Sequence, residues 1–126
     1  DAPNLSATYK LAELDISGIK RFTAKLSEDK ISLPGAKQVF RHPDHDVVAR
    51  SGECNLGRPL LRPILLGGEL VEPLPDLETT RTYTAQSLRA LPERLRQLEV
   101  GDPHDVRLSK ELKELVERTR ENLRHV

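Results

Sequence analysis

The most polarised part of the sequence is the basic stretch at residues 20–41. It carries six cationic side chains against Glu28 and Asp29, a local excess of four positive charges. The cations are Lys20, Arg21, Lys25, Lys30, Lys37 and Arg41. Ammonium and guanidinium groups near the Ser27 hydroxyl and near turn amides could hold a phosphate or a diphosphate. The alternative is that these charges face solvent and protect a sheet edge.

A second group of residues whose side chains could bind a metal or act in catalysis consists of His42, His45 and Cys54. The two histidines flank Pro43 in a loop, which differs from the helical i,i+4 pair of a zinc hydrolase, and one cysteine leaves a structural zinc site short of ligands. A nucleophilic Cys54 would need a histidine and an orienting group beside it. We therefore expect a solvated turn, a half-buried thiol and no metal. A single cysteine also fits a reducing compartment, which predicts a cytoplasmic protein.

Several function classes are excluded by composition and motifs. The 126 residues hold 20 Lys+Arg and 20 Asp+Glu, so bulk positive charge for nucleic-acid binding is missing, and two Tyr and two Phe make no stacking platform. No apolar run reaches the roughly 20 residues of a membrane span. The chain has no Gly-x-Ser-x-Gly, no Walker motif and no Gly-x-Gly-x-x-Gly, so it shows no catalytic residue of its own.

Turn residues divide the chain into a strand-rich half and a helical half. Prolines and glycines are concentrated before Asp76 and become sparse after it. This distribution predicts an α+β fold, with a strand- and turn-rich segment at residues 1–76 and a helical segment at residues 77–126. Two or three helices are expected to follow antiparallel strands.

The first half predicts strands joined by tight turns. Residues 9–14 and 21–26 alternate around Gly18 as a β-hairpin would. Leu33-Pro34-Gly35-Ala36 predicts a type II turn, because proline presets φ and glycine supplies the positive φ. Further strands are expected at residues 37–41, 46–50 and 60–66, the last at a sheet edge because of its prolines.

Apolar spacing predicts the helices of the second half. The first begins after Asp76 as N-cap and ends near Ala90, and a second begins at Pro92, because proline suits a first helical turn. Ser109 caps the last helix, whose apolar stripe must dock on another surface. That stripe consists of Leu108, Leu112, Leu115, Val116 and Leu123.

Four motifs together resemble the C-terminal stretch of nicotinate phosphoribosyltransferases. They are Tyr9-Lys10-Leu11, Lys25-Leu26-Ser27-Glu28-Asp29-Lys30, Leu33-Pro34-Gly35-Ala36-Lys37-Gln38-Val39-Phe40-Arg41 and Pro73-Leu74-Pro75-Asp76-Leu77-Glu78. Leu91-Pro92-Glu93 and Val106-Arg107-Leu108-Ser109 before a final helix agree with the end of that family. The order and spacing match over most of the chain.

The resemblance implies a transferase of NAD biosynthesis and pyridine nucleotide salvage, of ligase or glycosyltransferase type. Such an enzyme forms nicotinate mononucleotide from nicotinate and 5-phosphoribosyl 1-diphosphate with ATP assistance and Mg²⁺. The family fold is an irregular α/β barrel, that of the type II phosphoribosyltransferases, and the working unit is a homodimer. The family's Gly-Val-Gly-Thr loop, phosphorylatable histidine and nicotinate-binding arginines have no counterpart here, and the chain opens at Asp1. The segment is therefore expected to be part of a longer enzyme, inactive alone and without a bound cofactor of its own.

The resemblance assigns substrate contact to six residues. Lys10, with Ser6 as hydroxyl companion, is similar to residues that face the diphosphate in related nicotinamide phosphoribosyltransferases. Lys25, Ser27, Lys37 and Arg41 belong to the matching basic motif, and either contact phosphate or dock their hairpin on the barrel. The expected partners are the remainder of the enzyme, a second subunit and the substrates. The alternatives are a non-catalytic interaction module and an independent binder of small phosphate ligands.

Overall fold

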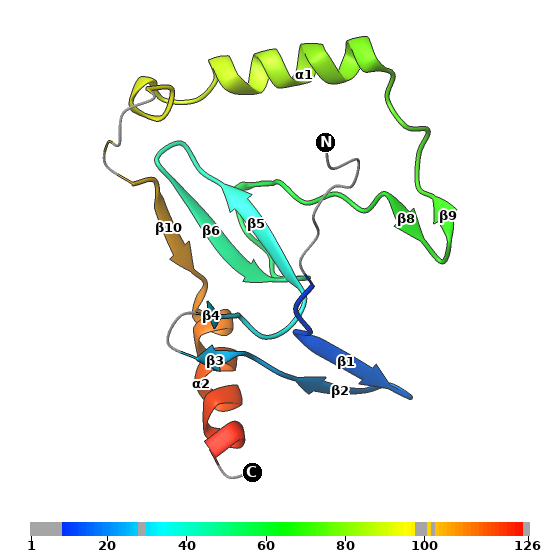
Figure 1. The fold of residues 1–126 in the computed structure, drawn as a ribbon, viewed down its shortest axis with the longest axis vertical. Coiled ribbons are helices and arrows are strands. Elements are labelled where there is room, and N and C mark those ends of the chain that lie inside the picture. The colour runs from blue at the N-terminus through cyan, green and yellow to red at the C-terminus, as the bar shows by residue number, and fades with distance from the viewer. Residues whose placement is uncertain (1–8, 28–29, 98–100, 102, 125–126) are drawn as a thin grey trace, which may run out of the picture. The chain divides into compact units, whose positions relative to one another are not determined.

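The computed structural model describes residues 9–27, 30–97, 101 and 103–124, which form two compact units. The first unit combines the described residues up to Leu60 with those from Val106 onward, and the second runs from Leu61 to Asp105. The division into segments 1–76 and 77–126 stays a prediction. The predicted α+β class is confirmed, because strands and two α-helices share the chain (Figure 1).

A four-stranded sheet is the scaffold of the first unit. Its order is β10 (Asp105–Leu108), β6 (His45–Arg50), β5 (Lys37–Arg41) and β7 (Arg58–Pro59). β5 and β6 are antiparallel, with Lys37 opposite Arg50 and Arg41 opposite Asp46. The strands predicted at residues 37–41 and 46–50 are thus confirmed.

A hairpin of β1 (Glu13–Ile16) and β2 (Ile19–Phe22) precedes this sheet. Ser17 and Gly18 form its turn at φ values of 53° and 83°, the positive values of a tight hairpin turn. A hairpin that turns at Gly18 is confirmed, but the predicted strand bounds are wrong, because the strands lie next to the turn at residues 13–16 and 19–22 and not at residues 9–14 and 21–26. Two further short strands, β3 (Leu26–Ser27) and β4 (Lys30–Ile31), pair antiparallel and were not predicted separately.

The last helix, α2 (Lys110–Arg124), packs against β6 and contributes to the core. Ser109 caps it as predicted, because the Leu112 N–H donates to Ser109 Oγ at 3.1 Å. Leu112, Leu115 and Thr119 are buried, together with Pro34, Phe40 and Ala49. The α2 stripe was expected to dock on another surface, and its centre lies against β6 of the same chain.

The second unit contains a small hairpin and a helix. β8 (Leu65–Leu66) and β9 (Glu69–Leu70) pair around Gly67 and Gly68, and α1 (Leu77–Arg89) follows. The Thr79 N–H donates to Asp76 Oδ1 at 2.7 Å and Ala90 is the C-cap, so both predicted ends of α1 are confirmed. No helix of the described residues is long and apolar enough to cross a membrane.

Two further predictions about elements are wrong, and one strand was not predicted. Residues 60–66 are not one edge strand, because Pro59 ends β7 and Pro63, without an N–H, keeps the intervening chain out of a ladder. The helix expected from Pro92 is only the 3₁₀ turn η1 (Glu93–Leu95), since Gly101 and Pro103 follow closely. β10 was not predicted from the sequence.

Candidate functional site

Lys37 holds the Pro34–Gly35 turn together. Its Nζ donates to the carbonyl oxygens of Leu33 at 2.8 Å and Gly35 at 2.5 Å. Burial lowers the pKa of the Lys37 ammonium, because a low-dielectric environment penalises the charged form. Gly35 has φ +77°, as the predicted type II turn requires. An ammonium has three N–H donors, so Lys37 keeps one for another acceptor.

Arg41 forms a bidentate ion pair across the sheet with Asp46. Its Nε and Nη2 donate to the two carboxylate oxygens at 3.0 and 2.8 Å. Asp46 is buried and lies opposite Arg41 in the β5–β6 register. The Arg41 guanidinium, whose side chain is 38% exposed, therefore balances the charge of the buried Asp46 carboxylate.

The other residues predicted to contact substrate lie in different segments of the structure. Lys10 is exposed before β1, and Lys25 is exposed before β3, where its backbone N–H donates to Ser32 Oγ at 2.7 Å. Ser27 lies in β3 with its backbone opposite Lys30, and Ser6 lies outside the described residues. Of the described candidates, Lys37 and Arg41 share one face of one strand, because strand residues four apart point to the same side.

Glu13 joins the hairpin to the Pro34–Gly35 turn and was missed in the sequence. It accepts from Lys20 Nζ at 2.5 Å and from the Ala36 N–H at 3.2 Å. These two bonds, the Lys20 bond first, lower the pKa of the Glu13 carboxyl, and the same contact raises the pKa of Lys20. The signal in the sequence was only a glutamate and a lysine on either side of the Gly18 turn.

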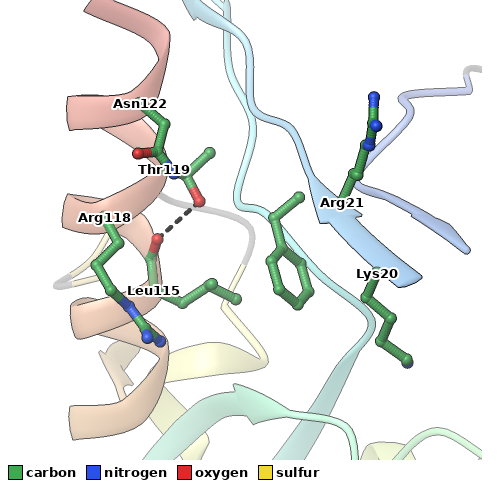
Figure 2. A pocket seen from close by; sticks show the side chains of 7 residues that line it. Lys20, Arg21, Leu115, Arg118, Thr119 and Asn122 are labelled. Atoms are coloured by element: carbon green, nitrogen blue, oxygen red, sulfur yellow. Dashed lines mark hydrogen bonds between the residues drawn. The ribbon is translucent and has the colours of Figure 1, made fainter. Parts of the chain in front are cut away.

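A pocket of about 400 Å³ opens between β2 and α2 (Figure 2). Phe22 and Leu115 supply its apolar surface, and the Thr119 hydroxyl is committed to the Leu115 carbonyl oxygen at 2.8 Å. Its remaining lining residues are polar or cationic. They are Lys20, Arg21, Arg118 and Asn122.

The charges around this pocket do not converge on one point. Figure 2 shows the Lys20 and Arg21 side chains pointing away from one another, and Lys20 is already paired with Glu13. A bound phosphate needs donors aimed at the same position. The pocket therefore suits an apolar group more than a phosphate. Lys20 and Arg21 belong to the basic stretch found in the sequence, whereas Arg118 and Asn122, which lie one turn apart on α2, were not predicted.

The histidines lie at the β5–β6 turn and are bonded within the domain. The rings of His42 and His45 stack with centroids 4.6 Å apart, and their nitrogens bond Asn55 Oδ1 and Asp44 Oδ1, each at 2.8 Å. The bond to His45 lowers the pKa of the Asp44 carboxyl. Over the described ranges, no group of three or more His, Cys, Asp or Glu side chains could hold a metal ion. Cys54 is exposed, so the expectation of a half-buried thiol is wrong.

The fold and these contacts define the class of protein: a small α+β domain in which charged side chains stabilise the turns and strands of the domain itself. Comparisons with known proteins identify the family within this class. Residues 24–116 match the family described as the nicotinate phosphoribosyltransferase C-terminal domain. The chain is 40% identical over 105 residues to a nicotinate phosphoribosyltransferase of Mycobacterium tuberculosis, covering 79% of this chain and 22% of the relative. The mouse nicotinate phosphoribosyltransferase is 32% identical over 146 residues, covering 91% and 26%.

The solved structure of human nicotinic acid phosphoribosyltransferase has a similar fold. Its TM-score is 0.62 at 26% sequence identity, covering 79% of this chain and 26% of the human chain. The chain belongs to the nicotinate phosphoribosyltransferase family and corresponds to its C-terminal domain. It spans about a quarter of the length of these relatives. The family resemblance noted in the sequence is thereby confirmed.

Proposed function

We propose that this chain is the C-terminal part of an enzyme that forms nicotinate mononucleotide from nicotinate and 5-phosphoribosyl 1-diphosphate in NAD biosynthesis. The observation that carries the proposal is the 40% identity over 79% of the chain to a nicotinate phosphoribosyltransferase. This chain spans about a quarter of these relatives, and we assign the reacting groups to the remainder of the enzyme. The alternative of a purely non-catalytic module is not favoured by these relatives.

The domain's own contribution is the placement of cations near the departing diphosphate. As the bond between ribose and diphosphate breaks, the ribose carbon gains positive character and negative charge grows on the leaving oxygens. A fixed ammonium aimed at those oxygens lowers the barrier. Lys10 is the first candidate for this role, because its side chain is exposed and the family resemblance assigns it to the diphosphate. Ser6 is its proposed companion.

The contacts of the remaining candidates support different roles for them. Lys25 is exposed and keeps the role of a phosphate contact, with Ser27 as its neighbour in the basic motif. Lys37 and Arg41 are bonded within the domain, which supports a positioning role in which they hold the turn and the β5–β6 pair in place. Lys37 can still offer its third N–H to a phosphate oxygen.

The intact enzyme is proposed to use ATP and Mg²⁺, to act as a homodimer and to lie in the cytoplasm. Mg²⁺ binds through carboxylates, water and substrate phosphates. The described residues hold no ligand cluster for a resident metal, so this part of the chain does not fit such a site. The ion and the nucleotide are therefore assigned to the remainder of the enzyme and to the substrates.

The test is Lys10→Ala in the intact enzyme, with Lys110→Ala as control. Loss of a charged hydrogen bond to the diphosphate costs about 1.5–3 kcal/mol, so KM for the phosphoribosyl donor should rise roughly tenfold or more, while KM for nicotinate stays unchanged. Lys110 is a surface lysine of α2 whose side chain is 90% exposed, and its loss should leave both constants unchanged. An unaltered donor KM in Lys10→Ala would remove Lys10 from the site.

A further inference from the structure

Residues 61–77 expose an unusual density of large apolar side chains. We call this segment the apolar arm. Eight of its side chains are between 48 and 68% exposed. They are Leu61, Ile64, Leu65, Leu66, Leu70, Val71, Leu74 and Leu77. The arm carries only four charges, on Arg62, Glu69, Glu72 and Asp76.

The arm and the helix that follows it lack a core of their own. Every residue from 61 to 105 whose side chain the structure describes is exposed or half-buried. Ordering a residue costs about 1–2 kcal/mol of backbone entropy, and a two-stranded hairpin or a 13-residue helix is marginal alone in water. Many large apolar side chains exposed within one short segment indicate an interaction site. These elements therefore need an apolar surface to cover them.

We propose that the apolar arm docks on the part of the same enzyme chain that precedes this domain. This inference rests on the proposed function. The relatives are about four times as long as the share this chain covers, so most of each enzyme lies outside the region described. A surface on the same polypeptide is present at a high effective concentration near the arm. A surface on a second molecule lacks this advantage.

The charges of the arm define the chemistry of the surface that receives it. One arginine against three acids gives the arm a net charge of minus two. The receiving surface is therefore apolar at its centre and basic at its rim. The arm, more than the α2 stripe, attaches this domain to the enzyme.

Thiol labelling of the intact enzyme tests the inference directly. Leu66→Cys and Leu74→Cys are introduced in a Cys54→Ser background, because Cys54 itself is exposed. Leu56→Cys is the matched control, since Leu56 is 102% exposed and lies outside the arm. With a maleimide probe, the two arm thiols should react roughly tenfold or more slowly than the control thiol, because a covered side chain reacts only through local opening.

The outcomes separate the possible occupants. Slow labelling of both arm thiols at every protein concentration supports docking within one chain. Arm thiols that label as fast as the control at every concentration overturn the proposal. Protection that disappears on dilution to the monomer also overturns it and assigns the arm to a second copy. If a cysteine variant fails to fold, amide hydrogen exchange of residues 61–77 in the wild-type enzyme replaces the labelling. Slow exchange supports the proposal, and fast exchange contradicts it. Labelling needs no activity, whereas a wild-type enzyme that made no nicotinate mononucleotide would refute the proposed function separately.

Discussion

Gly35 lies where the Pro34–Gly35 turn, the β1–β2 hairpin and α2 meet. Its N–H donates to the Ala12 carbonyl oxygen at 2.8 Å, and its own carbonyl oxygen accepts from Lys37. A Cβ at this position would lie 3.1 Å from Leu115 Cδ2 and 3.6 Å from the Phe22 ring. Both its positive φ and its close neighbours thus favour glycine.

Gly35→Ala is expected to destabilise the domain by about 2–3 kcal/mol, since backbone strain and a steric contact add. Gly18→Ala is the control, because Gly18 has φ +83° but a Cβ there would meet no neighbour within 4 Å. It should lose only about 1 kcal/mol. Urea unfolding of the two variants gives the comparison, and equal losses would show that the contact with Leu115 contributes nothing.

Glu13 should make stability depend on pH. Its folded pKa lies below the ordinary 4.5, so it stabilises the fold above that pH, and the contribution is lost as the pH falls through the folded pKa. Glu13→Gln should therefore lower the free energy of unfolding at pH 7 but have little effect at the acid end. Urea titrations between pH 7 and the lowest pH at which the domain remains folded check this, and a difference that does not depend on pH would contradict it.

At the scale of elements, the junction between β6 and α2 is built from a short chain of hydrogen bonds. The Ser109 hydroxyl donates to Glu53 Oε1 at 2.9 Å while accepting from the Leu112 N–H, and the Arg50 N–H donates to the same glutamate oxygen. The Ser109 N–H also donates to the Val48 carbonyl oxygen at 2.9 Å. The start of α2 is thereby fixed to the end of β6, with Leu112 fully buried one turn further on.

Leu112→Ala should destabilise this junction by about 2–5 kcal/mol, the usual range for a buried leucine. Leu123→Ala provides the comparison at the far end of the same helix, where the side chain is 41% exposed, and should cost less than about 1 kcal/mol. Thermal unfolding followed by circular dichroism measures both. If the two variants melted alike, α2 would not be packed as described.

Local signals in the sequence were enough for the elements that local chemistry determines. Asp76, Ser109 and Gly18 each mark a cap or a turn through contacts a few residues away, and these positions were predicted correctly. The cations of the basic stretch were found, but their partners were not. The reason is that Arg41 meets Asp46 only through strand register, and Lys37 bonds backbone oxygens. The pairing of β10 with β6 joins residues far apart in sequence, which periodicity does not reveal.

At the scale of the whole molecule, the two units should differ in local stability. The first unit contains the buried side chains of the described residues, whereas α1 in the second has none. Amides protected only by a solvated helix exchange quickly, while those of a core sheet exchange through global unfolding. In the 126-residue chain, amides of α1 should therefore exchange much faster than those of β5 and β6. Mass spectrometry of deuterium uptake measures this, and equal protection would contradict it.

The polypeptide leaves the four-stranded sheet after one outermost strand, β7, and rejoins it at the opposite outermost strand, β10. Residues 61–105 are thus an excursion whose two attachment points are set by the sheet, so its length can vary at little entropic cost. The alignment with the mouse enzyme runs over 146 positions, more than the 126 residues of this chain. Homologues can therefore be expected to absorb insertions and deletions in this excursion while keeping the strands on either side in register.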